Sequence, residues 1–115
     1  MATVAPDTHQ TLSGISSGDH DLLHELMGLR EAELESSGLD PRTFSLVKIA
    51  ALIALDAPPA SYAFQVANAV EAGVSSEEVL GVLRAVATQV GGPRVVAAAP
   101  EIMLALGLSL PEGAE

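Results

Sequence analysis

Three polar side chains in the middle of the chain have the spacing of a binding site on one helix face. Ser61, Gln65 and Asn68 occupy positions i, i+4 and i+7 of the segment SYAFQVANAVEAG, in which Ala and Val predominate. Residues with this spacing lie on the same side of an α-helix. Hydroxyl and amide groups beside an apolar pocket can orient a carbonyl or carboxylate oxygen of a small molecule. A solvated helix face explains the same pattern, so the residues alone leave both interpretations open.

Two titratable residues near this polar stripe are candidates for proton transfer. Tyr62 is adjacent to Ser61, and Asp56 lies between an apolar run and the Pro-rich break that precedes the stripe. A carboxylate that is desolvated at such a position can act as a base. An aspartate at this place is also typical of a simple turn.

A pair of histidines is the one arrangement that could suggest a metal. His20 and His24 are four residues apart and adjacent to Glu25, a spacing that can hold zinc. The HExxH order is absent and no third ligand is evident, so we expect a solvent-facing pair. We predict no metal site and no cofactor.

The composition excludes several classes of function. Fifteen acidic and five basic residues give a net charge of -10, which disfavours binding to nucleic acid or to anionic lipid. The absence of cysteine excludes a thiol nucleophile, a thiolate metal site and a disulfide. The longest apolar run, residues 49–55, is far shorter than the ~20 residues of a membrane-spanning helix. Because the N-terminus also lacks the features of a secretory signal, we expect a cytoplasmic protein.

The elements that carry these residues are all predicted to be helices. Residues 1–15 are rich in Thr, Ser, Pro and Gly and are expected to form a flexible arm, followed by a single all-α domain over residues 16–115. Five or six helices are expected in this domain. The helical segments are 16–38, 41–56, 59–72, 76–90 and 94–107, with Pro100 kinking or dividing the last one.

Several helix boundaries have specific local signals. Asp40 can cap the helix that begins at Pro41. Gly73 is a typical stop after the helix that carries the polar stripe. Ser75 and Glu78 have the spacing of a capping box, which predicts that the next helix begins there.

Three segments together resemble the carboxymuconolactone decarboxylase and alkylhydroperoxidase superfamily. They are LDPRTFSLVKIAALIAL, QVANAVEAGVSSEEVLGVL and VGGPRVVAAAPEIMLALG, and the resemblance covers residues 39–107. The peroxidase branch has a Cys-x-x-Cys, a histidine four residues later and a glutamate on the preceding helix. These positions fall here on Pro58 and Ser61, on Gln65, and near Ser45. The resemblance implies the fold of the superfamily, whereas thiol peroxidase chemistry is excluded because a hydroxyl and an amide cannot replace the thiols and the imidazole.

Two functions follow from this resemblance. The first is a cofactor-independent lyase or isomerase that acts on a lactone, an oxo acid or a related carbonyl compound. Tyr62 or Asp56 would then transfer protons, while Ser61, Gln65 and Asn68 would bind the substrate. The second is a non-catalytic relative that binds a ligand or partner.

The resemblance also has an implication for assembly. The helix over residues 45–55 is apolar around almost its whole circumference, which leaves apolar surface to be covered. Members of the superfamily form trimers and hexamers. We therefore expect a homo-oligomer with the polar stripe near a subunit boundary.

Overall fold

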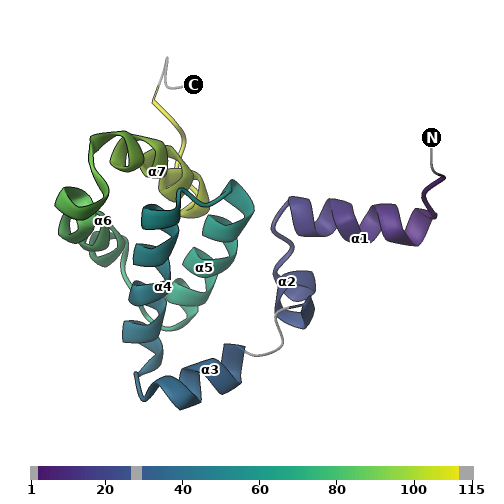
Figure 1. The fold of residues 1–115 in the computed structure, drawn as a ribbon, viewed down its shortest axis with the longest axis horizontal. Helices are drawn as coiled ribbons and strands as arrows, with labels where there is room; N and C mark the ends of the chain where they lie inside the picture. The colour runs from purple at the N-terminus through teal and green to yellow at the C-terminus, as the bar shows by residue number, and fades with distance from the viewer. Residues whose placement is uncertain (1–2, 27–29, 112–115) are drawn as a thin grey trace.

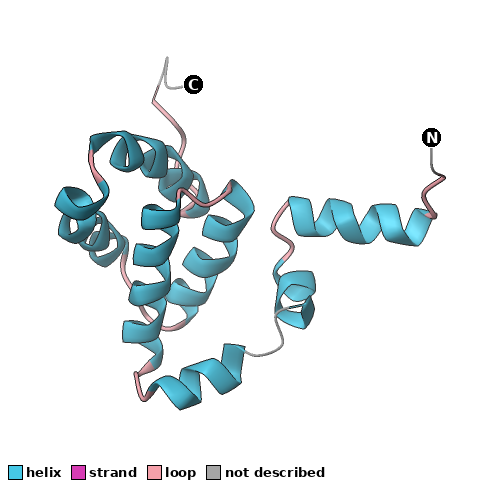
Figure 2. Ribbon diagram, in the orientation of Figure 1, coloured by secondary structure: helices cyan, strands magenta, loops and turns pink. Residues whose placement is uncertain are grey.

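The computed structural model describes residues 3–26 and 30–111, and every regular element in these residues is a helix (Figure 1, Figure 2). The helices are α1 (Pro6–Ser16), α2 (His20–Leu26), α3 (Arg30–Ser37), α4 (Pro41–Leu55), α5 (Pro59–Glu71), α6 (Ser76–Val90) and α7 (Gly92–Ala105). The all-α class is thus confirmed. No helix in the described residues is both long and apolar enough to cross a membrane.

The N-terminal third differs from the expectation in two ways. Residues expected to form a flexible arm include the helix α1, which has Pro6 at its first position but no side-chain cap and no buried residue. Within the expected single helix over 16–38, the described residues form α2 and α3, and residues 27–29 between them lie outside the described part of the structure. At the other end of the chain, Pro100 lies inside α7, which runs as one helix from Gly92 to Ala105.

The predicted boundaries of α4 are correct. The Asp40 side chain accepts a hydrogen bond from the backbone N–H of Thr43 at 2.9 Å, which satisfies one of the free donors of the first turn. At the other end, Asp56 has a φ of 53° in the left-handed region and terminates the helix.

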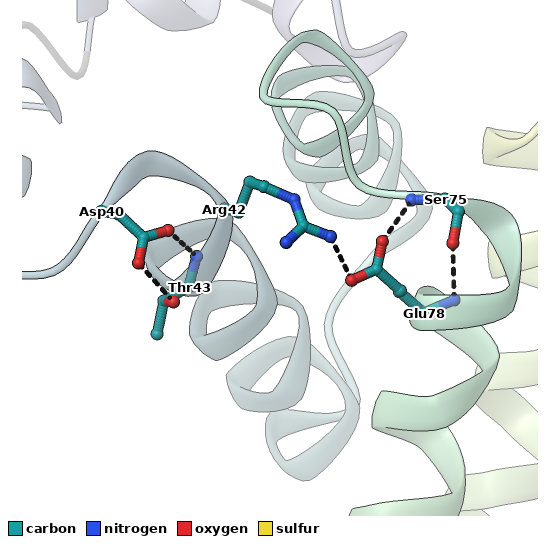
Figure 3. Close-up of polar contacts among 5 residues, drawn as sticks. All are labelled: Asp40, Arg42, Thr43, Ser75 and Glu78. Atoms are coloured by element: carbon teal, nitrogen blue, oxygen red, sulfur yellow. Dashed lines mark hydrogen bonds and ion pairs between the residues drawn. The ribbon is translucent and has the colours of Figure 1, made fainter.

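The predicted capping box of α6 is also present. The Ser75 hydroxyl accepts from the backbone N–H of Glu78 at 3.1 Å, and the Glu78 carboxylate accepts from the backbone N–H of Ser75 at 3.0 Å. Figure 3 shows that the same carboxylate also accepts a hydrogen bond from Arg42 in the first turn of α4. This contact joins the beginnings of α4 and α6.

The core lies among α4, α5, α6 and α7. Its central residues are apolar side chains from all four helices and from the loop before α6: Ile49, Ile53, Tyr62, Val66, Ala69, Val74, Val79, Ala98 and Ile102. On α5, Tyr62, Val66 and Ala69 follow one face with helical spacing. Gln65 and Asn68 each precede one of these core residues, so the polar stripe borders the core face.

The helices α1 and α2 project from this four-helix body. In Figure 1, α6 and α1 lie on opposite sides of the pair α4 and α5. The radius of gyration is 15.4 Å, compared with about 13 Å for a compact chain of this length. The difference reflects the extended position of the N-terminal helices.

Candidate functional site

The polar stripe of α5 faces neighbouring helices rather than open solvent. Asn68 is buried, and Ser61 and Gln65 are half-buried. Ser45 on α4, near the position where the resemblance places a glutamate, is completely buried. A solvated face therefore does not describe this side of α5.

Arg30, the first residue of α3, brings Gln65 and Ser45 into one cluster. Its Nη1 donates to Oε1 of Gln65 at 3.2 Å, and its Nη2 donates to Oγ of Ser45 at 3.4 Å. Both distances are at or beyond the long end of the usual range for N–H···O bonds. In the described part of the chain, both hydrogen bonds of Arg30 thus go to neutral oxygens.

An aromatic ring supports the cluster from α4. The guanidinium carbon of Arg30 and Nζ of Lys48 each lie 5.0 Å from the ring centroid of Phe44, within the range of cation–π attraction. Lys48 also donates to the Glu33 carboxylate at 3.1 Å, which ties α3 to α4 a second time. The short helix α3 is therefore held against α4 and α5 through charged side chains.

Two hollows adjoin the cluster. The larger has a volume of about 290 Å³ and lies between α3, α4 and α5; its lining comprises Arg30, Glu31, Leu34, Pro41, Ser45, Asn68, Glu71 and Ala72. A smaller one of about 20 Å³ is lined by Arg30, Glu33, Lys48, Phe64 and Gln65. The larger volume is close to the lower limit of typical ligand sites, so it suits a small molecule.

Burial and neighbouring carboxylates act on the charge of Arg30 in opposite directions. Partial burial lowers the pKa of its guanidinium, while Glu33 and Glu71 oppose that shift. An arginine remains protonated despite such a shift, because its ordinary pKa is above 12. Arg30 is thus a partly desolvated cation beside the larger cavity.

The structure places the two candidate proton carriers away from this cluster. Tyr62 is buried in the core beside Ile49 and Ile53, and neither Tyr62 nor Asp56 lines either hollow. Asp56 is exposed at the end of α4. Burial raises the pKa of the Tyr62 phenol, and the charges of Asp56 and Glu101 raise it further.

The remaining candidates have different positions. Ser61 lies in the first turn of α5 and lines neither hollow. The side chains of His20 and His24 lie outside the described part of the structure. Within the described residues, no group of three or more His, Cys, Asp or Glu side chains is arranged to hold a metal ion.

Sequence reasoning missed Arg30, Lys48 and Phe44 as members of the site. Arg30 lies 35 residues before Gln65, and nothing local indicates that they meet. The one signal in the sequence was the scarcity of basic residues, since only five of the 115 residues are Lys or Arg. In the structure, two of these five contact the ring of Phe44.

The all-helical architecture of the described residues is compatible with a protein of the carboxymuconolactone decarboxylase type. A family model described as the carboxymuconolactone decarboxylase family matches residues 20–102. The chain belongs to this family, and the matched region contains Arg30, Ser45 and Gln65. Searches of curated proteins and of solved structures gave no match.

Proposed function

We propose that this chain binds a small organic molecule in the cavity between α3, α4 and α5, and that it does so without a redox cysteine pair. The ligand is a lactone, an oxo acid or a related carbonyl compound. The observation that carries the proposal is the convergence of Arg30, Gln65 and Ser45 beside a cavity of about 290 Å³. The resemblance assigns a histidine to the position of Gln65 and a glutamate near that of Ser45.

Arg30 is the proposed anchor for a ligand oxygen. A guanidinium has five N–H donors in a planar fork, and only two hydrogen bonds from Arg30 are formed within the described structure. A carboxylate or carbonyl oxygen can accept from the remaining donors, and a charge-assisted bond to it would be shorter than the two present ones. Asn68 adds an amide to the lining of the same cavity.

The acidic residues of the cavity limit the charge of the ligand. Glu31 and Glu71 also line it, and both side chains are exposed. Two carboxylates beside one guanidinium disfavour a dianion, because like charges at short range repel. The proposed ligand is therefore neutral or carries a single negative charge.

Binding without catalysis is the function that this geometry supports best. A proton-transfer group must lie within hydrogen-bond reach of the reacting atom, directly or through one water. Tyr62 is in the core, and its raised pKa keeps the phenol protonated at neutral pH. Glu31 and Glu71 line the larger cavity, but both side chains are exposed, whereas a carboxylate that serves as a general base near neutral pH is usually desolvated.

A lyase or isomerase is the second candidate, as the family resemblance implies, with Tyr62 or Asp56 as the proton carrier. Such an enzyme would use Tyr62 or Asp56, so at least one of Tyr62→Phe and Asp56→Asn should abolish turnover of a bound ligand. Under the binding proposal, both variants retain the ligand response of the parent.

The test is a thermal-shift screen with small lactones, oxo acids and aromatic carboxylic acids. A ligand that binds only the folded state stabilises it by about 2.7 kcal/mol at 100 times its Kd. Gln65 does not line the larger cavity but accepts a hydrogen bond from Arg30, so we expect Gln65→Ala to reduce the shift by releasing the proposed anchor. The matched control is Gln89→Ala, which changes an exposed glutamine on α6. An equal ligand response in both variants and the parent would refute the site.

We also propose that the protein is a homo-oligomer, a trimer or hexamer as the resemblance implies. Large apolar side chains are exposed on both α4 and α7: Leu55 and Val96 are each 74% exposed, and Val47 and Leu104 each 53%. Soluble chains commonly cover such surface by closed symmetric association. Light scattering at micromolar concentration measures the mass.

A further inference from the structure

An apolar groove lies between α6 and α7. It has a volume of about 280 Å³, and its apolar lining includes Leu80, Leu83, Ala99, Ile102, Met103 and Leu106. Leu80 is 44% exposed at its margin. A groove with this lining is suited to receive apolar side chains of a helix.

The helix α1 is a second element whose apolar side chains are not covered by the rest of the chain. None of its 11 residues is buried, and Leu12 is 57% exposed. Its closest approach is to α2, where Leu22 lies against the backbone of Gly14. A helix of this length is marginal in water without tertiary packing, so α1 requires a further surface to be stable.

The connection between α1 and α2 directs α1 away from the groove of its own chain. Gly18 has a φ of 79°, and a Cβ there would lie 3.2 Å from the carbonyl oxygen of Ala60, so the turn packs closely on α5. Asp19 fixes the start of α2 by accepting from the backbone N–H of Leu22 at 3.0 Å. In Figure 1, which is viewed down the shortest axis, α4 and α5 stand between α1 and α6.

We propose that α1 of one copy docks, through Leu12, in the α6–α7 groove of a second copy. Each chain has one α1 helix and one α6–α7 groove. In a closed ring of identical chains, every α1 can therefore dock in the groove of a neighbouring copy, and no groove is left empty. This goes beyond the proposed homo-oligomer, because it specifies which two surfaces meet. It does not depend on the proposed ligand site.

The absence of cysteine permits a direct crosslinking test. A Leu12→Cys chain and a Met103→Cys chain that carries a size tag are co-expressed, purified and oxidised. We expect a disulfide between one tagged and one untagged chain. The matched control replaces Met103→Cys with Leu39→Cys, which offers an exposed position in the α3–α4 loop. Crosslinking that is absent, or equally efficient with the control, would overturn the proposal.

A second measurement separates exchange between chains from closure within one chain. The double variant Leu12→Cys/Met103→Cys should form covalent multimers at any concentration at which the parent is oligomeric. A disulfide confined to single chains would overturn the proposal, as would a monomeric parent in light scattering. Leu12→Asp should lower the mass of the assembly, whereas Leu39→Asp, at an exposed leucine in the α3–α4 loop, should not.

Discussion

The contact between Arg30 and Gln65 can be measured by a double-mutant cycle. Arg30→Met keeps an unbranched apolar stem and removes the guanidinium, and Gln65→Ala removes the acceptor. The two hydrogen bonds of Arg30 are long, so we assign each about 0.5–1 kcal/mol rather than the larger value of a short charged bond. The cation–π contact with Phe44 contributes about 0.5–1 kcal/mol at a partly exposed site.

The partial burial of Arg30, which lowers its pKa, costs desolvation free energy. This cost offsets part of the stabilisation from the two hydrogen bonds and the cation–π contact. We therefore expect Arg30→Met to reduce the free energy of unfolding by about 1–2 kcal/mol, from the sum of these contributions. For a domain of this size the melting temperature should fall by about 4–8 °C. The coupling between Arg30 and Gln65 should be about 0.5–1 kcal/mol.

The assay is urea denaturation followed by circular dichroism on the parent, both single variants and the double variant. Protein concentration is held constant because the stability of an oligomer depends on it. Arg84→Met, at an exposed position on α6, measures the cost of removing an arginine that is not in the cluster. Additivity of the two single changes within about 0.3 kcal/mol would show that Arg30 and Gln65 do not interact, and the proposed site would lose its anchor.

Three further predictions concern chemistry, acid stability and the α1–α2 turn. Purified, metal-free protein should not consume hydroperoxides with any thiol reductant, because the chain has no cysteine; sustained turnover in a peroxide assay would contradict this. Hydrogen bonds from Ser75 and Arg42 lower the pKa of Glu78, so its contribution is present above the unfolded pKa of about 4.3 and is lost as pH falls through the lower folded pKa. Melting temperature should therefore fall between about pH 5 and pH 3, and less steeply in Glu78→Gln; parallel curves would argue against it. Gly18→Ala should cost about 1–2 kcal/mol because φ is 79°, and should increase proteolysis near the turn; an unchanged digestion pattern would contradict the packing on α5.

Features encoded by neighbouring residues could be predicted from the sequence. The Asp40 cap and the Ser75–Glu78 capping box depend on side chains three residues apart, and both are present as expected. The first residues of α4 and α6 follow from these local signals. By contrast, α1 has no side-chain cap and no buried face, so its helix had no local signal beyond Pro6.

Features that depend on packing between distant segments could not be predicted. Tyr62 and Gln65 are close on the same helix, yet Tyr62 belongs to the core row with Val66 and Ala69, whereas Gln65 faces α3. The apolar spacing of that row was visible in the sequence and could have placed Tyr62 in the core. The contribution of Arg30 was not visible, because it requires the position of α3 relative to α5.

The two residues that accept hydrogen bonds from Arg30, Ser45 and Gln65, suit ligand binding by Arg30 better than the glutamate and histidine of the resemblance would. A glutamate at position 45 would pair with the guanidinium and occupy the donors proposed to bind ligand. A histidine at position 65 would lie beside a cation, which disfavours its protonated form and so lowers its pKa. Ser45 and Gln65 instead accept hydrogen bonds while remaining neutral, so neither of them forms an ion pair that would occupy the donors of Arg30. Ser45→Glu should therefore abolish binding of a monoanionic ligand; because Ser45 is completely buried, circular dichroism must first show that the variant is still helical. Retained binding in that variant would place the ligand elsewhere.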